Sequence, residues 1–407
     1  MFFKPTGLTG SGRRTAIGMR DAVARPLLFA GVALVAALAA TPAQAAFQTK
    51  AKQAILIDAD SGAILYQRNA DQLMSPASMS KLMTLAVMFR ALKTGQLTLD
   101  EEFLMTENAW RKGGAPSGTS AMFVPLNKKA KISQLLQGII VQSGNDASIA
   151  VAEGMAGSEA QFAKIMEAEA RRIGLKKSTF RNATGLYHPE HLMTARELAI
   201  LSRHIIKTYP DFYKMFAQKE FRYRRHRFIN RNPLLFVEPN VDGLKTGFVS
   251  KAGYGLVASA KGKGRRLILV VNGLATKQQR KEEGRKLLQW GFRSFKEFKL
   301  FDAGDVIGQA RVWGGTQVYV PLTGNGVISV ILPRFPANQR LRGEIVYNRP
   351  LKPPIRKGDE VAKLRVTTSA NAVNEVPLYA AEDVKRAGMM RRGLDSLLHL
   401  ALGWIPL

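Results

Sequence analysis

The sequence predicts an α+β domain followed by a small all-β domain and a terminal helix. Between residues 46 and 300, strand-like apolar runs stand at both ends and helix-like segments lie between them, which is typical of a sheet that joins N- and C-terminal strands. From residue 301, short β-branched runs alternate with glycine and proline turns, a pattern typical of a β-sandwich. A chain of 407 residues with 46% apolar and 22% charged residues can fill both cores.

The first elements are a hairpin and a long apolar helix. Residues 54–57 and 63–66 are apolar runs around a turn-rich link, which indicates a β-hairpin. Residues 82–92 are nearly all helix formers, and Gly95 suits the C-terminus of their helix. The stretch Ser75-Pro-Ala-Ser-Met-Ser-Lys-Leu-Met-Thr84 stands at the opening of this helix.

The rest of the first domain mixes helices and strands. Residues 132–156 are largely helical but are interrupted at Ser143-Gly-Asn145, and residues 219–229 read as an extended segment dense in arginine and aromatics. Further helices are expected at 159–173, 195–207 and 278–298, a loop at 184–194, and strands entered through 241–247 and at 254–260 and 265–271.

The second domain, residues 301–380, and the tail, residues 381–407, differ in pattern. Strands are expected at residues 317–321, 327–332, 344–347 and 361–367. In the tail, apolar residues recur at helical spacing, Trp404 stands near the end and basic residues lie upstream. Such a helix suits an anionic membrane surface, whereas a helix docked on the β domain is the alternative. The residues concerned are Met390, Leu394, Leu397, Leu398, Ala401 and Ile405, with Lys385, Arg386, Arg391 and Arg392.

The N-terminus indicates export. Residues 26–40 form an uncharged apolar run that follows Arg20 and Arg25 and precedes the small-x-small site Ala43-Gln-Ala45. This is the pattern of a secretory signal peptide over residues 1–45, and the run is short for a membrane span. The chain has no cysteine, which excludes disulfides, thiol catalysis and cysteine metal sites.

A formal net charge of +29 indicates an anionic partner. Nucleic acid, an anionic membrane and an anionic wall polymer would each suit this charge. The basic residues are spread over the whole chain and nothing resembles a nucleic-acid module, so we predict no nucleic-acid partner.

Ser78 and Lys81 form the candidate reactive pair. Positions i and i+3 share one face of a helix, so the hydroxyl and the amine should lie close together. A lysine held beside a serine in a closed pocket can lose its proton and accept that of the serine, which makes the serine a nucleophile. The spacing alone is weak evidence, because a surface serine and lysine fall three apart by chance about once in a chain of this length.

Two further motifs follow in chain order, Ser143-Gly-Asn145 and Lys245-Thr-Gly247. This trio resembles the serine penicillin-recognising enzymes. The residues around the three motifs are most similar to those of the low-molecular-mass D-alanyl-D-alanine carboxypeptidases of peptidase family S11. The resemblance covers essentially the whole mature chain. Lys-Thr-Gly also occurs at Lys93, where it ends a helix, and Ser-x-Asn also occurs at Ser369, in the predicted β domain. Neither copy has the structural context that its motif requires. The resemblance implies a β-lactamase/transpeptidase-like first domain with an antiparallel sheet.

The resemblance also implies roles for the catalytic residues. Ser78 would be the nucleophile and Lys81 the base that activates it. Ser143 would relay a proton to the leaving amine, and Asn145 would hold both the substrate peptide and Lys81. The oxyanion donors would be the backbone N–H groups of Ser78 and Phe248.

Substrate binding would fall to the third motif. Lys245 would supply positive charge, and Thr246, helped by Arg231, would bind the terminal carboxylate. At the start of a strand, alternation turns Thr246 away from Lys245, and Gly247 should leave space for a substrate backbone. The implied substrate is the peptidoglycan stem pentapeptide, with β-lactams as covalent inhibitors, no cofactor, and a peripheral position on the periplasmic face of the cytoplasmic membrane.

Several alternatives remain open. His188 and His191 could contribute to a metal site, but Pro189 makes their segment a loop, and we predict no metal. The chain has five histidines, so a Ser–His–Asp triad is also open, although none of them sits in a Gly-x-Ser-x-Gly-like elbow. A class A β-lactamase would need a deacylating glutamate, for which Glu190 and Glu197 fall in the right region. A DD-endopeptidase would share the same site, and an inactive wall-binding scaffold would not need all three motifs.

Overall fold

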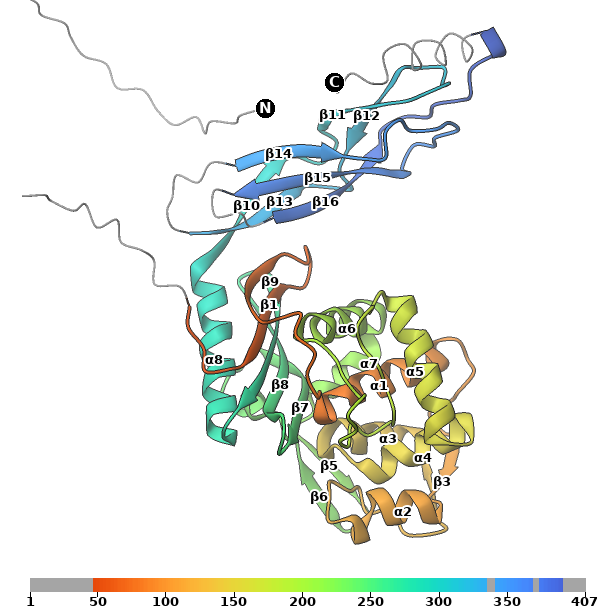
Figure 1. Ribbon diagram of the computed structural model, residues 1–407, viewed down its shortest axis with the longest axis vertical. Coiled ribbons are helices and arrows are strands. Elements are labelled where there is room, and N and C mark those ends of the chain that lie inside the picture. Colours follow the sequence, from red (N-terminus) through yellow and green to blue (C-terminus); the bar gives the residue numbers. More distant parts are fainter. Residues whose placement is uncertain (1–46, 335–340, 369–372, 391–407) are drawn as a thin grey trace, which may run out of the picture.

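The computed structural model describes residues 47–334, 341–368 and 373–390. Its first part is built on a five-stranded antiparallel sheet in the order β2-β1-β9-β8-β7, so that β7 lies at an edge (Figure 1). The N-terminal hairpin pairs directly with β9, which confirms that strands from the two ends share one sheet. The strands are β1 (Gln53–Asp58), β2 (Ile64–Arg68), β7 (Val241–Val249), β8 (Gly253–Gly262) and β9 (Arg265–Leu274).

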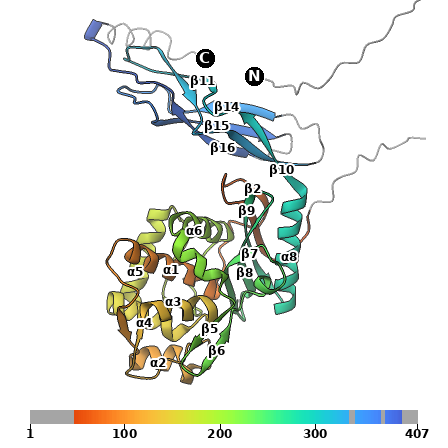
Figure 2. The same ribbon diagram turned by 180° about the vertical axis from the view of Figure 1, so that it is seen from behind.

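Both faces of this sheet are buried. Alternate residues of β1 point to opposite sides, with Ile55 and Ile57 in the core shared with the helical region and Ala54 and Leu56 in the core under α8 (Lys277–Ser294). Figures 1 and 2 show α8 on one side of the sheet and the remaining helices on the other. The predicted α+β architecture is therefore confirmed.

The helical region holds most of the other elements. Its helices are α1 (Lys81–Lys93), α2 (Glu107–Gly113), α3 (Ile132–Gln137), α4 (Asn145–Ala156), α5 (Glu159–Ile173), α6 (Ala195–Thr208) and α7 (Pro210–Tyr213). Short turns of helix are η1 (Ala77–Ser80), η2 (Ala115–Ser117), η3 (Gly138–Gln142), η4 (Lys214–Ala217) and η5 (Pro233–Phe236). Two small hairpins complete it, β3 (Glu102–Leu104) with β4 (Lys129–Lys131) and β5 (Glu220–Tyr223) with β6 (His226–Ile229).

The second part is all-β, as predicted. Two sheets, β10-β13 and β11-β12-β16-β15-β14, share one apolar core. Their strands are β10 (Phe295–Phe301), β11 (Val306–Arg311), β12 (Tyr319–Thr323), β13 (Ile328–Pro333), β14 (Leu341–Val346), β15 (Glu360–Thr368) and β16 (Val373–Ala380).

One helix boundary differs from the prediction. The helix expected to run to residue 298 ends at Ser294, because Phe295 begins β10 and pairs with Pro333 in β13. The all-β part therefore begins near residue 295 rather than at 301. Hydrogen bonding to a strand distant in sequence outweighs the helical preference of this segment.

The beginning of the tail also differs from the prediction. Residues 381–387 are not helical: Val384 is fully buried and forms an isolated bridge with Ile355, and Ala387 donates its N–H to the carbonyl of Gly314. These residues belong to the β domain because they supply an apolar side chain to its core. The rest of the predicted tail helix, residues 391–407, and the predicted signal peptide lie outside the described residues. In the described part, no helix is long and apolar enough to cross a membrane.

The helices α2 and α4 approach each other closely at Gly113. A Cβ built on Gly113 would stand 2.4 Å from the backbone nitrogen of Asp146 and 2.5 Å from the carbonyl carbon of Asn145. Neither backbone atom can yield as a flexible side chain could, so only glycine lets the two helices lie at this distance.

We expect Gly113→Ala to lower the free energy of unfolding by about 1–3 kcal/mol, because the extra methyl group must push α2 away from α4. Chemical denaturation measures this. The matched control is Gly343→Ala in β14, where the nearest atom is 3.7 Å from the new Cβ and little change is expected. Equal stabilities of the two variants would contradict the close approach.

Candidate active site

The start of α1 brings Ser78 and Lys81 together. Ser78 lies in η1 and is partly exposed, whereas Lys81, the first residue of α1, is fully buried. Lys81 Nζ lies 3.2 Å from Ser78 Oγ. The helix predicted at residues 82–92 is therefore present, with the partly exposed serine just before it and the buried lysine at its first position.

Lys81 Nζ has two closer partners. It lies 2.6 Å from Asn145 Oδ1 and 2.5 Å from the carbonyl oxygen of Thr184. Burial lowers the pKa of Lys81 to about 7, helped by the positive charge of Arg231 and opposed by nearby carboxylates. A neutral amine has two N–H groups, which these two oxygens accept, so its lone pair is left facing Ser78 Oγ.

A second buried lysine stands beside the second motif. Ser143 follows η3 with a φ of 64° and accepts a hydrogen bond of 2.8 Å from Lys245 Nζ. Lys245 is only 2% exposed. Burial lowers the pKa of Lys245 well below its usual value, and the nearby charges of Lys81 and Arg231 lower it further.

The segment 119–124 holds Asn145 and the start of α4. Asn145 donates from Nδ2 to Thr119 Oγ1 at 2.9 Å and from its backbone N–H to the carbonyl of Ser120 at 2.7 Å. The buried carboxylate of Asp146 accepts backbone N–H groups from the same segment, and burial raises its pKa against the effect of these hydrogen bonds. Asn145 is thereby held in one orientation, with Oδ1 on Lys81.

The third motif lies on β7, at the edge of the main sheet. Thr246 is buried, and Phe248 is half exposed and stacks on Tyr254 at 4.2 Å. A Cβ on Gly247 would stand 2.8 Å from the carbonyl oxygen of Pro76. Glycine therefore lets β7 pack against η1, which carries Ser78. The space that Gly247 is expected to leave for a substrate backbone stays a prediction.

Arg231 reaches the same region. Its guanidinium donates to Ser120 Oγ at 2.6 Å, and its charge acts on both buried lysines. The structure therefore gathers the predicted residues Ser78, Lys81, Ser143, Asn145, Lys245 and Arg231 into one linked cluster.

Two contributors were missed from the sequence. Thr184 acts through its backbone carbonyl, which leaves no trace in residue identity. Its turn is held by Asn182, whose Oδ1 accepts from Thr184 N–H, Thr184 Oγ1 and Gly185 N–H, an Asx turn that the sequence Asn-Ala-Thr-Gly could have indicated. Gly185 has φ +71°, and a Cβ there would stand 2.0 Å from the carbonyl oxygen of Ala77.

The histidines and glutamates considered for a metal site or a β-lactamase have other hydrogen-bond and ion-pair partners. His191 is buried, accepts from Arg181 N–H, and has a pKa lowered to about 4 mainly by burial. Glu197 accepts from Lys176 N–H, Lys177 N–H and Ser178 Oγ, and Glu190 pairs with Arg181. Within the described residues, no group of three or more histidine or acidic side chains is arranged to hold a metal ion.

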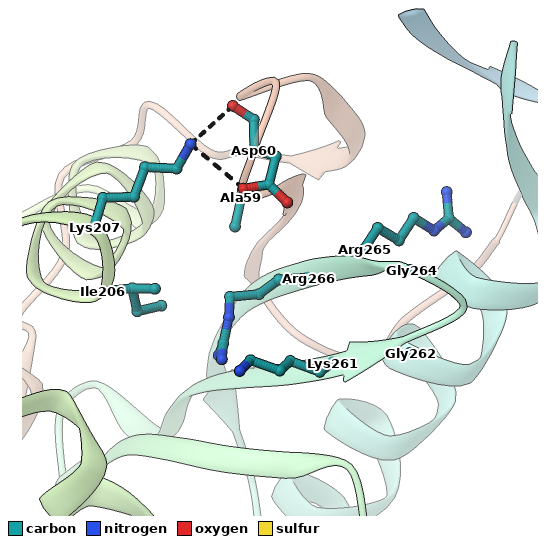
Figure 3. A pocket seen from close by; sticks show the side chains of 9 residues that line it. All are labelled: Ala59, Asp60, Ile206, Lys207, Lys261, Gly262, Gly264, Arg265 and Arg266. Carbon is teal, nitrogen blue, oxygen red and sulfur yellow. Dashed lines mark hydrogen bonds and ion pairs between the residues drawn. The ribbon is translucent and has the colours of Figure 1, made fainter. Parts of the chain in front are cut away.

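A pocket of about 330 Å³ lies away from this cluster, between the end of α6 and the turns β1–β2 and β8–β9 (Figure 3). Lys207 Nζ lies 3.1 Å from the carbonyl oxygen of Asp60 and 3.5 Å from its carboxylate. Arg266 is held by Asp242. Since these cations already have partners, we assign no function to this pocket.

Comparison with known proteins agrees with this geometry. Residues 39–276 match the D-alanyl-D-alanine carboxypeptidase family, peptidase S11, and residues 295–386 match the C-terminal domain of penicillin-binding protein 5. The chain is 36% identical to D-alanyl-D-alanine carboxypeptidase DacA of Haemophilus influenzae, over 88% of this chain and 90% of that protein. It is 33% identical to DacF of Bacillus subtilis, over 84% and 87%.

Solved structures give the same result. Penicillin-binding protein 5 from Haemophilus influenzae has a TM-score of 0.73 at 36% identity, covering 84% of this chain and 99% of that one. The likeness places the chain among the penicillin-binding proteins. Within that class, it belongs to the D-alanyl-D-alanine carboxypeptidase family of serine peptidases.

The burial of Lys81 predicts a pH dependence of stability. Folding lowers the pKa of Lys81 from 10.5 to about 7, so between these values the unfolded chain binds a proton that the folded chain does not. The free energy of unfolding contributed by this group therefore rises from about pH 7 to about pH 10. We expect wild type to gain stability relative to Lys81→Met over this range in denaturant titrations. A difference between the two that does not change with pH would contradict the prediction.

Proposed function

We propose that the protein is a serine D-Ala-D-Ala carboxypeptidase that removes the terminal D-alanine from peptidoglycan pentapeptides through an acyl-enzyme. The observation that carries the proposal is the position of Lys81, whose amine is buried, within reach of Ser78 Oγ and bound on its other side by two oxygens. A base held in this way has no other partner for its lone pair. The family to which the chain belongs supports the same activity.

Acylation would begin with neutral Lys81. As Ser78 Oγ attacks the carbonyl carbon of the penultimate D-alanine, its proton passes to Lys81 Nζ and the carbonyl becomes an oxyanion. The backbone N–H groups of Ser78 and Phe248 would stabilise that charge. A pKa of about 7 leaves a large fraction of Lys81 able to accept the proton near neutral pH.

Collapse of the oxyanion breaks the C–N bond. The leaving D-alanine nitrogen takes a proton from Ser143 Oγ, which is hydrogen-bonded to Lys245 Nζ. The proton that Lys81 took from Ser78 passes to Ser143 in its place, so Ser143 is again a hydroxyl and Lys81 a neutral amine. D-Alanine leaves, and an ester remains on Ser78. Water then attacks this ester, with the neutral Lys81 as the base that accepts the proton of the water. The bond between the carbonyl carbon and Ser78 Oγ breaks, Ser78 Oγ takes the proton back from Lys81, and the shortened peptide is released.

The third motif and Arg231 would recognise the substrate. Arg231, whose charge acts on Lys245, would place positive charge near Thr246, and the hydroxyl of Thr246 would bind the terminal carboxylate. β7 is an edge strand, so its outer backbone groups are able to pair with an extended peptide. Asn145 Nδ2 would turn from Thr119 to the carbonyl of the substrate peptide.

β-Lactams would acylate the same serine. Penicillin-binding protein D2 from Listeria monocytogenes, 27% identical with a TM-score of 0.55, has been solved in ampicillin-bound form. The β-lactamase alternative is disfavoured because the carboxylates of Glu190 and Glu197 are already engaged by other partners.

We expect wild type to be labelled by a fluorescent penicillin and to release D-alanine from a pentapeptide, and Ser78→Ala to do neither, because the ester cannot form. Ser80→Ala is the matched control, since Ser80 is buried two residues away and is expected to keep both activities. Labelling without D-alanine release would contradict the carboxypeptidase proposal, and absence of labelling in wild type would contradict the acyl-enzyme.

We also propose that the exported protein is held peripherally on the periplasmic face of the cytoplasmic membrane by its C-terminal tail. The tail carries the basic and apolar residues typical of an interfacial helix, and Met389 and Met390 at its start are 86% and 92% exposed.

Deleting residues 391–407 should release the protein from anionic vesicles in a sedimentation assay, because it removes the tail without removing Val384 from the β-domain core. Penicillin labelling of the shortened chain shows that the first domain is intact. Continued sedimentation of the shortened chain would contradict the anchor.

A further inference from the structure

A hairpin beside the active site carries an unusual concentration of arginine. We define the basic hairpin as residues 220–229, which form β5, a two-residue turn and β6. Four arginines against one glutamate give it an excess of three positive charges. All four are exposed, namely Arg222, Arg224, Arg225 and Arg227. The aromatic side chains of the hairpin are buried on its other face.

The basic hairpin breaks two rules of local stability. Arg222 stands directly opposite Arg227 across the strands, where like charges repel, and both share Glu220. At the turn, Arg224 has φ +53°, a conformation that glycine and asparagine adopt at much lower cost. For comparison, the β8–β9 turn of the same chain also places a non-glycine residue, Lys263, at φ +53°. Its next residue is Gly264, whereas Arg224 is followed by a second arginine. Local strain of this kind is expected where the side chains have a function.

The basic hairpin is rigidly joined to the active-site cluster. Its inner face packs on Phe123, whose ring centroid lies 5.0 Å from that of His226 and 6.3 Å from that of Phe228. Phe123 belongs to the segment that holds Asn145, through Asp146 and Thr119. Both strands also contact η3, which ends just before Ser143. The basic hairpin is therefore joined to the segments that carry Asn145 and Ser143.

The position of the basic hairpin disfavours a membrane as its partner. In Figures 1 and 2 the hairpin lies at the end of the molecule away from the β domain, which carries the tail. A tail bound to the membrane would therefore leave the arginines facing the wall. Exposed guanidinium groups bind carboxylates in a bidentate manner, with an affinity that falls as salt rises.

We propose that the basic hairpin is a second binding subsite, which takes free carboxylates of peptidoglycan stem peptides next to the peptide that reacts at Ser78. This inference rests on the proposed function and deepens it. The enzyme would act better on an acidic peptidoglycan oligomer than on the same oligomer with its side-chain carboxylates amidated. The terminal D-alanine carboxylate, bound at the third motif, would be the same in both.

The test compares kcat/KM for these two oligomers at low and high salt. Wild type should prefer the free-carboxylate oligomer by about threefold to tenfold at low salt, the range for one or two exposed ion pairs, and should lose the preference in high salt. The variant Arg224→Gln/Arg225→Gln should show no preference at low salt. The matched control, Lys261→Gln/Lys263→Gln, removes the same charge from another exposed turn and should keep the preference of wild type.

Stability gives a second measurement. Arg224→Gly should raise the melting temperature by roughly 2–4 °C, because glycine relieves the strained φ, while it weakens the preference for free carboxylates. A variant that is more stable but less selective cannot be explained by unfolding.

These measurements distinguish failure of the subsite from failure of the proposed function. A preference in wild type that survives Arg224→Gln/Arg225→Gln would overturn the subsite, as would no preference at all. Inhibition by polyphosphate that distinguishes wild type from the hairpin variant, without any effect of amidation, would also overturn it in favour of a phosphate site. Failure to release D-alanine from either oligomer would instead overturn the proposed function, and the subsite with it.

Discussion

The burial of two lysine amines is the constraint on which the rest of this structure depends. Lys81 and Lys245 are almost completely removed from water, and a charged amine in such a place costs several kcal/mol unless it is neutralised or hydrogen-bonded. Burial lowers the pKa of each, and the charge of Lys81 lowers the pKa of Lys245 further. The burial that lowers stability thus also lowers the pKa of Lys81, so that this amine is available as a base near neutral pH.

Holding these amines requires segments that are distant in the chain. The oxygens around Lys81 come from α4 and from the turn at Thr184, and Ser143 on Lys245 follows a distorted turn of helix. Close backbone approaches bring these segments together at Gly185 and Gly247. The site is therefore a junction between the helical region and the edge strand β7, so a small shift of either part would separate the base from its serine.

In the basic hairpin, too, the side chains with a proposed binding function lower the stability of the fold. Its inner aromatics secure it to the segment that orients Asn145, and its outer arginines repel one another. Sequence and geometry agree that this segment is extended and solvent-exposed on one face. Only the structure shows that it lies beside the catalytic cluster, because nothing in residues 219–229 indicates a contact with Phe123.

By itself, the sequence determined the order of the three motifs, the helix after Ser78, the sheet that joins strands from both ends of the first domain, and the change to an all-β domain. These follow from periodicity and residue type, which act locally along the chain. Tertiary structure alone decided that Phe295 begins a strand, that Val384 belongs to the β-domain core and that the carbonyl of Thr184 binds Lys81. Each depends on a partner far away in sequence. Every residue has a backbone carbonyl, so the residue type cannot indicate which carbonyl binds Lys81.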